Sequence, residues 1–91
     1  MKMSVADFSG KIGTMVHRSK HFQREHCKKG KPQIGIITGC EYFADSIGNP
    51  ICWPIVMWEG CRTMPSLTHP VLVDFYRKDQ KKYAKRRDMV E

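Results

Sequence analysis

Residues 33–43 read QIGIITGCEYF, and this stretch decides the fold. Its two interleaved sets of residues would face opposite sides of an extended strand, because successive side chains of a strand alternate between faces. The β-branched residues in the run favour a pleated, half-buried strand. Residues 44–50, ADSIGNP, follow it and are typical of a turn. The stretch therefore predicts a long strand that enters a hairpin.

Four further short strands are predicted on either side of this one. Residues 51–58, ICWPIVMW, form the second arm of the hairpin, edge-like or bulged at Pro54 because proline cannot donate to a ladder. Turn residues then separate strands at residues 61–64 and 71–75, and residues 12–17 form an initial strand. Five short strands with one long loop after the first predict a mainly β fold, a small, partly open five-stranded barrel.

The two ends of the chain read differently from the middle. Residues 78–90 contain strong helix formers with no Gly or Pro, so we expect a basic helix with a thin apolar stripe. The start of the chain offers at most one turn of helix, after Ser4. The predicted organisation is an N-terminal extension (1–11), a barrel (12–76) with a long basic loop (19–32), and a basic C-terminal helix or tail (77–91).

Charge is the most distinctive feature of the composition. Sixteen Lys and Arg against nine Asp and Glu give 91 residues a net charge of +7, which points to a polyanionic or acidic partner. Residues 17–32 hold six cations and one acid, and residues 77–91 hold seven cations and three acids. Residues 33–76 instead hold four acids and one cation. A chain this short forms one small domain, which argues against a large multi-step enzyme.

The sequence gives no sign of a membrane span or of export. The longest nearly uncharged run, residues 43–58, is interrupted by Gly48, Pro50 and Pro54, and the first residues lack an apolar run. We therefore expect a cytoplasmic protein with no membrane partner. The four cysteines, at positions 27, 40, 52 and 61, form no C-x-x-C motif. Reduced, partly buried thiols are the expectation, with disulfides or a metal site as open alternatives.

Four short runs resemble small SH3-like barrels of the Tudor/KOW type. They are GTMV at 13–16, IGIITG at 34–39, PIVMWEG at 54–60 and THPVLV at 68–73. The pattern is similar to that of short SH3-like proteins encoded by tailed bacteriophages and covers residues 12–75. This resemblance implies a five-stranded SH3-like barrel and a binding module without catalytic residues, in the host cytoplasm if the chain is viral. The long cationic loop and the basic C-terminal segment depart from the family pattern.

The two basic segments are the predicted binding surface, because dense Lys and Arg beside aromatic residues suit phosphate contacts with stacking. The alternative for each is a plain solvated loop or helix. Trp53 and Trp58 would lie on opposite faces of their strand, one in the core and the other available to a ligand, and the alternative is that both are core residues. The candidate contacts to nucleic acid or an acidic partner are Arg18, Lys20, Arg24, Lys28, Lys29, Lys31, Arg77, Lys78, Lys81, Lys82, Lys85, Arg86 and Arg87, and the candidate aromatic contacts are Phe22, Trp58 and Tyr83.

Metal binding and catalysis find less support in the sequence. His17, His21, His26 and Cys27 are expected to be loop residues, although a zinc site built from them stays open. The acids are scattered, so no cofactor, metal or enzymatic activity is predicted. The predicted function is a non-enzymatic basic module that contacts nucleic acid or a nucleoprotein machine. The alternative is a phage structural or host-interaction protein, such as an inhibitor, that acts through protein contacts with a host or virion complex.

Overall fold

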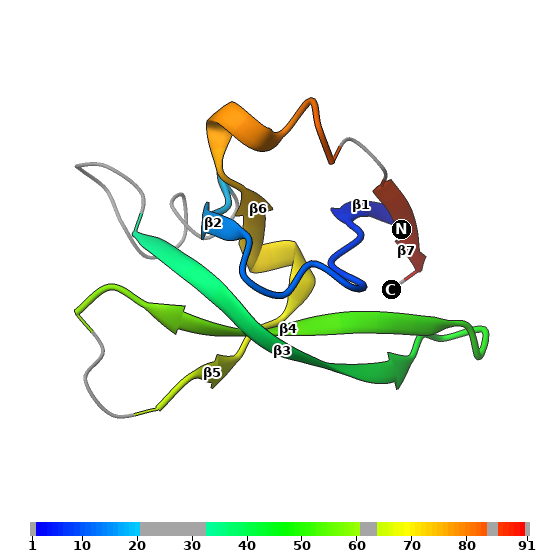
Figure 1. The fold of residues 1–91 in the computed structure, drawn as a ribbon. Helices are drawn as coiled ribbons and strands as arrows, with labels where there is room; N and C mark the ends of the chain where they lie inside the picture. The colour runs from blue at the N-terminus through cyan, green and yellow to red at the C-terminus, as the bar shows by residue number, and fades with distance from the viewer. Residues whose placement is uncertain (1, 21–32, 61–63, 84–85, 91) are drawn as a thin grey trace.

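The computed structural model describes residues 2–20, 33–60, 64–83 and 86–90. It contains one five-stranded and one two-stranded antiparallel sheet (Figure 1). In chain order the elements are β1 (Lys2–Ala6), β2 (Met15–Arg18), β3 (Ile34–Ala44), β4 (Pro50–Trp58), β5 (Ser66–Leu67), the 3₁₀ turn η1 (Pro70–Leu72), β6 (Val73–Phe75), the 3₁₀ turn η2 (Arg77–Asp79) and β7 (Arg86–Val90). The mainly β fold predicted from the sequence is confirmed.

The larger sheet has the strand order β5-β4-β3-β2-β6. Strands β2, β3 and β4 each pair with the next strand along the chain, and β6 returns to pair with β2. The five antiparallel strands predicted from the sequence are therefore present. Within the described residues β5 and β6 do not pair with each other, so the sheet is not closed.

Three of the five strands are shorter than expected, and the first of them, β2, begins at Met15 and not at residue 12. The fourth strand is predicted at residues 61–64, of which 61–63 lie outside the described residues and Met64 is not in a strand. The observed strand β5 lies further along the chain and consists of Ser66 and Leu67. The last strand is predicted from residue 71, but residues 70–72 form η1, whose first residue is Pro70. His69 caps this turn, since its Nδ1 accepts a hydrogen bond of 3.1 Å from the backbone N–H of Val71.

The β3–β4 hairpin is the longest pairing in the molecule and follows the predicted alternation. Its turn is held by Asp45, whose Oδ1 accepts hydrogen bonds from the backbone N–H groups of Ile47 (2.9 Å) and Asn49 (2.8 Å). The register shifts between Ile37 and Gly39 of β3, which is a β-bulge. The irregularity predicted at Pro54 thus falls on the partner strand.

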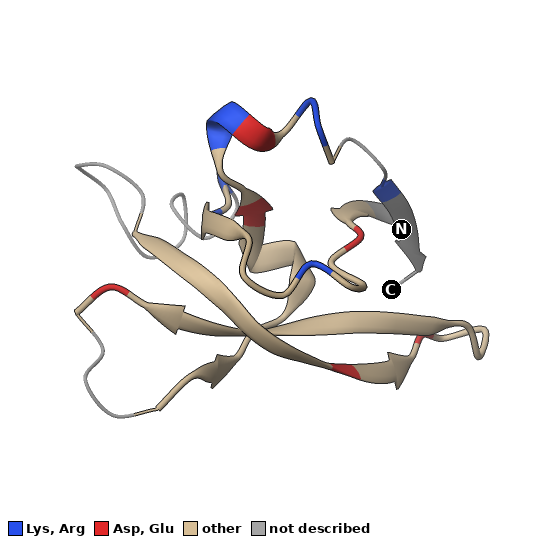
Figure 2. Ribbon diagram, in the orientation of Figure 1, with Lys and Arg blue, Asp and Glu red and all other residues tan. Residues whose placement is uncertain are grey.

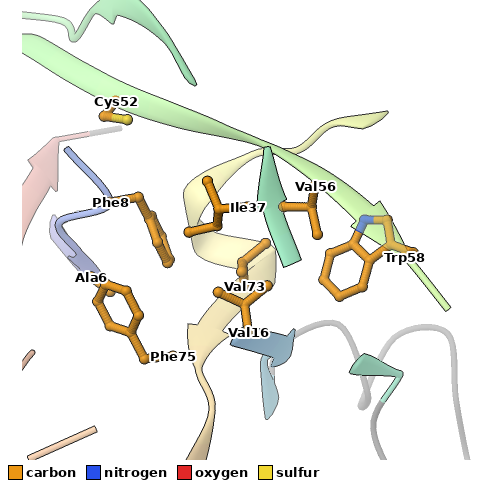
Figure 3. Close-up of a cluster of buried hydrophobic side chains, with 9 residues drawn as sticks. All are labelled: Ala6, Phe8, Val16, Ile37, Cys52, Val56, Trp58, Val73 and Phe75. Atoms are coloured by element: carbon orange, nitrogen blue, oxygen red, sulfur yellow. The ribbon is translucent and has the colours of Figure 1, made fainter. Parts of the chain in front are cut away.

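The main core lies between the hairpin, β2, β6 and the N-terminal segment (Figure 3). Gly35 makes room for it: a Cβ atom there would come within 2.5 Å of Val56 Cγ1 and 2.8 Å of Trp58 Cε3. A glycine inside a strand often marks such a close approach. The core residues are Ala6, Phe8, Val16, Ile37, Cys52, Val56, Trp58, Val73 and Phe75.

The expected basic helix at residues 77–91 is wrong. Residues 77–79 form the single 3₁₀ turn η2, and residues 86–90 form β7, which pairs with β1 from Lys2↔Val90 to Ala6↔Arg86. A helix over this stretch would present only a thin apolar stripe to the core, whereas pairing with β1 satisfies its backbone groups. Intrinsic helix propensity is a weak preference that such long-range pairing overrides. None of the helical turns among the described residues is long or apolar enough to cross a membrane.

The expected N-terminal extension takes part in the fold. Residues 2–6 form β1 rather than a turn of helix, and Val5, Ala6 and Phe8 are buried. Phe8 is fully buried, and its ring lies 4.9 Å from that of Phe75, centroid to centroid (Figure 3). Val5 packs with Ile51 in a second, smaller cluster. The start of the chain therefore contributes buried side chains to both core clusters.

Candidate functional site

The segment from η2 to Tyr83, residues 77–83, carries the densest group of exposed cations in the described structure. Arg77, Lys78, Lys81 and Lys82 are all exposed, and in this part of the chain no carboxylate forms an ion pair with them. Asp79 is the one acid within the segment. Figure 2 shows basic residues along this segment, while the β3–β4 hairpin has none. We call residues 77–83 the cationic segment.

Backbone and side-chain bonds fix the cationic segment to the sheet. The N–H of Tyr76 donates to the carbonyl of Met15 (3.0 Å) and that of Tyr83 to the carbonyl of Asp79 (3.1 Å). The side-chain amide of Gln80 donates to the carbonyl of Phe75 at 3.3 Å. The segment is therefore a defined surface, although it is not a helix.

Tyr83 anchors the end of this segment and gathers charge around its ring. The ring centroid lies 5.0 Å from that of Phe75, and the side chain packs against the main core. The ammonium groups of Lys11 and Lys82 lie 4.9 and 5.5 Å from the Tyr83 ring centroid, within cation–π range. Sequence reasoning missed Lys11, and no local signal points to it, because only the fold brings residue 11 next to residue 83.

The remaining C-terminal candidates are less well placed. Arg86 is exposed, but its Nη2 lies 3.4 Å from a carboxylate oxygen of Asp74, which partly neutralises it. An exposed pair of this kind contributes little to stability. Lys85 lies outside the described residues, and Arg87 belongs to β7, with a side chain that lies outside the description. The described part of the surface therefore rests on residues 77–83 and Lys11.

Arg18 lies at the base of the long basic loop. Its Nε donates to the side-chain oxygen of Gln33 (3.2 Å), and its guanidinium lies 3.8 Å from the centroid of the Trp58 ring. Of the next two residues, Ser19 is buried and donates its hydroxyl to the carbonyl of Val71 (2.7 Å), whereas Lys20 is exposed. The other loop candidates, Phe22, Arg24, Lys28, Lys29 and Lys31, lie outside the described residues.

Trp58 is a core residue and not an exposed aromatic contact. It is 2% exposed, and its Nε1–H donates to the hydroxyl of Thr68 at 3.4 Å. The tryptophan nearer the surface is Trp53, half-buried between the rings of Phe43 (4.8 Å) and His69 (4.6 Å). The sequence predicts opposite faces for the two residues correctly. The glycine opposite Trp58, at position 35, is the signal that identifies the buried one.

The candidate metal ligands are described only in part. Among the described residues no group of three or more His, Cys, Asp or Glu is placed to hold a metal ion. His17 donates from Nδ1 to the carbonyl oxygen of its neighbour Arg18 at 2.8 Å. His21, His26 and Cys27 lie outside the described residues.

Two of the four cysteines can be described, and both are free thiols. Cys40 is half-buried and Cys52 is buried. Burial, together with a hydrogen bond between the protonated thiol of Cys52 and Cys40, raises the pKa of the Cys52 thiol to about 12. A thiol with such a raised pKa is a poor nucleophile at neutral pH. This agrees with the expectation of buried thiols for Cys40 and Cys52, and positions 27 and 61 lie outside the description.

Comparison with known proteins gives no assignment. No protein-family model, no curated protein and no solved structure matches the chain. A function for the chain therefore has to be inferred from the chemistry of its own surface. On that surface the exposed cations of residues 77–83 stand out, held in place by Tyr83.

Proposed function

We propose that the chain is a non-enzymatic binding module that contacts nucleic acid through the cationic segment. The observation that carries this proposal is the exposure of Arg77, Lys78, Lys81 and Lys82 within six residues, with no carboxylate paired to them in the described structure. Cations that no protein carboxylate neutralises are available to phosphates. Lys11 extends the same surface from a distant part of the chain.

Nucleic acid suits this surface better than a single small anion. The four exposed cations follow one another along a single segment of the chain, at positions 77, 78, 81 and 82, so they can contact successive phosphates of a polymer. The partly buried Tyr83 ring lies among them and supplies a flat apolar surface beside the charges. Arg18 and Lys20, with the basic residues of the loop at 21–32, would add to the same electrostatic attraction.

The fold class that we propose for this module is an SH3-like barrel. The strand order of the larger sheet supports it. Four consecutive strands, β2 to β5, form an antiparallel meander, and the fifth, β6, returns beside the first after the 3₁₀ turn η1. The strand pair β1–β7 is an addition to that pattern.

Binding to a labelled 20-base-pair duplex and to a 20-nucleotide single strand tests the proposal by fluorescence anisotropy. Replacing Arg77, Lys78, Lys81 and Lys82 together by Gln should weaken binding roughly a hundredfold at 150 mM salt, because four phosphate contacts are lost. The matched control exchanges Arg for Lys and Lys for Arg at the same four positions, and it should bind within about threefold of the natural chain. Unchanged affinity of the Gln variant would overturn the proposal.

The competing function, contact with an acidic protein surface, is separated from the first by a pull-down with and without nuclease. If the cationic segment binds nucleic acid, recovered partners should be lost after nuclease treatment. A stoichiometric protein complex that survives nuclease, and that the Gln variant fails to form, would assign the cationic segment to a protein partner instead.

A further inference from the structure

One edge of the β3–β4 hairpin has no partner strand in the described structure. β2 pairs with β3 only along Ile34–Ile36, and the last backbone bonds beyond that pairing join Ile37 to Gly13 (2.7 Å) and Thr14 (3.1 Å). The segment before β2 turns away from β3 at Gly13, which has a φ of +87°. From Gly39 to the end of the strand, β3 pairs with β4 alone. We call residues 39–44 the free edge.

The direction of the backbone groups along the free edge follows from the backbone hydrogen bonds on either side of it. The backbone carbonyl of Pro54 accepts a hydrogen bond from the N–H of Thr68, so it points away from β3. Pro54 and Cys40 lie opposite each other and are not hydrogen-bonded to one another, so the backbone N–H and C=O of Cys40 point away from β4. Beyond the hairpin end, Asp45 donates inward to the carbonyl of Asn49. Because antiparallel residues alternate, Tyr42 also directs its N–H and C=O groups to the free edge.

The free edge is exposed, and Glu41 is the one charged residue in it. Residues 41–44 are all exposed, with Tyr42 56% and Phe43 40% accessible. Natural edge strands are commonly blocked by Lys or Pro or twisted by a bulge. Here the bulge precedes Gly39, and residues 39–44 contain neither Lys nor Pro. Such an edge is a template for an added strand.

Charge identifies the kind of strand that would fit. Residues 33–60 contain Glu41, Asp45 and Glu59 and no Lys or Arg, in a chain with a net charge of +7 (Figure 2). Glu41 lies in the free edge itself. A second copy of this edge would bring another Glu41 close to the first and would add a second chain of net charge +7. Along residues 33–60 a cationic strand would meet acidic side chains and no Lys or Arg.

We propose that the free edge binds an extended, cationic peptide segment of a partner protein as an additional antiparallel strand. Its backbone pairs with Cys40, Tyr42 and Ala44, and its basic side chains lie near Glu41. This site is separate from the cationic segment, so the chain joins an anionic polymer at one surface and a cationic peptide at another. It does not depend on the proposed nucleic-acid function.

A blocked, labelled peptide of sequence KVTVKVTK is the probe, and anisotropy in the presence of the intact chain is the measurement. Tyr42→Pro removes one outward N–H without touching the β3–β4 ladder, and should weaken binding about tenfold or more. The matched control Tyr42→Val keeps the N–H and the strand propensity and should retain binding within about threefold. An otherwise identical peptide with Glu for Lys should bind at least tenfold more weakly.

Two further arms keep the proposal open to refutation. If Tyr42→Pro does not fold, as judged by circular dichroism, peptides N-methylated at alternate residues in either register replace it, and one register should lose binding. Absence of binding by the natural chain, equal binding of Tyr42→Pro, or equal binding of the Glu peptide would overturn the proposal. So would self-association in sedimentation that Tyr42→Pro abolishes, because the occupant would then be a second copy.

Discussion

Replacing Tyr83 by Ala tests how the cationic segment is held to the fold. Its ring packs on Phe75 at 5.0 Å and against the main core, and the ammonium groups of Lys11 and Lys82 lie over it. The substitution removes all of these contacts at once. We expect both the stability of the domain and its affinity for nucleic acid to fall, because the same side chain contributes to each.

The expected size follows from the individual contacts. An aromatic pair contributes about 0.5–1.5 kcal/mol beyond burial, and an exposed cation–π contact about 0.5–1 kcal/mol. Together with the lost packing of a half-buried ring, Tyr83→Ala should lower the free energy of unfolding by about 2–3 kcal/mol. In a domain of this length the melting temperature should fall by about 10–20 °C.

Urea unfolding, followed by the fluorescence of the buried Trp58, measures the change directly. Tyr83→Phe is the matched control: it keeps the ring and should stay within about 1 kcal/mol of the natural chain. If Tyr83→Ala is as stable as Tyr83→Phe, the ring does not anchor the segment and the account of this surface is wrong.

Two further predictions concern the hairpin. Gly35→Ala should lower the free energy of unfolding by about 2–4 kcal/mol, since its Cβ would overlap Val56 and Trp58. The control Gly39→Ala, whose Cβ would lie 3.5 Å from the nearest atom, should lower it by less than about 1 kcal/mol. Equal losses in urea unfolding would contradict this packing. Cys52 should resist alkylation in the native protein at pH 8.5, because its pKa lies near 12 instead of 9, and rapid native-state labelling found by peptide mass spectrometry would be the opposite result. Its raised pKa stabilises the folded state below about pH 9 and loses that effect as the pH rises towards 12.

The hairpin could be predicted from the sequence because its determinants are local. Alternation and turn residues between positions 33 and 58 place β3, β4 and the Asp45 turn to within one residue of the observed strand bounds. The same alternation separates Trp53 from Trp58, although only the close approach at Gly35 shows which one is buried. Period-two patterns carry this information without reference to distant parts of the chain.

The two ends of the chain were beyond prediction because their structure depends on each other. Residues 2–6 and 86–90 pair although they are separated by nearly the whole length of the chain. In neither segment do apolar and polar residues alternate clearly enough to predict a strand. Helix propensity at residues 78–90 was the strongest local signal, and long-range pairing overrode it. The cluster of Lys11 and Lys82 around Tyr83 is likewise a product of the fold.

The salt dependence of binding tests whether the cationic segment contacts phosphates. For the intact chain and a 20-base-pair duplex, affinity is measured between 50 and 300 mM NaCl. Four phosphate contacts by the cationic segment predict a slope of about −3.6 or steeper for the logarithm of the association constant against the logarithm of salt concentration, because Lys11 and the basic loop can add contacts. A slope of about −3.6 is a loss of about twelvefold for each doubling of the salt concentration. A slope near zero, or no measurable binding at 50 mM NaCl, would contradict the claim that this surface binds nucleic acid.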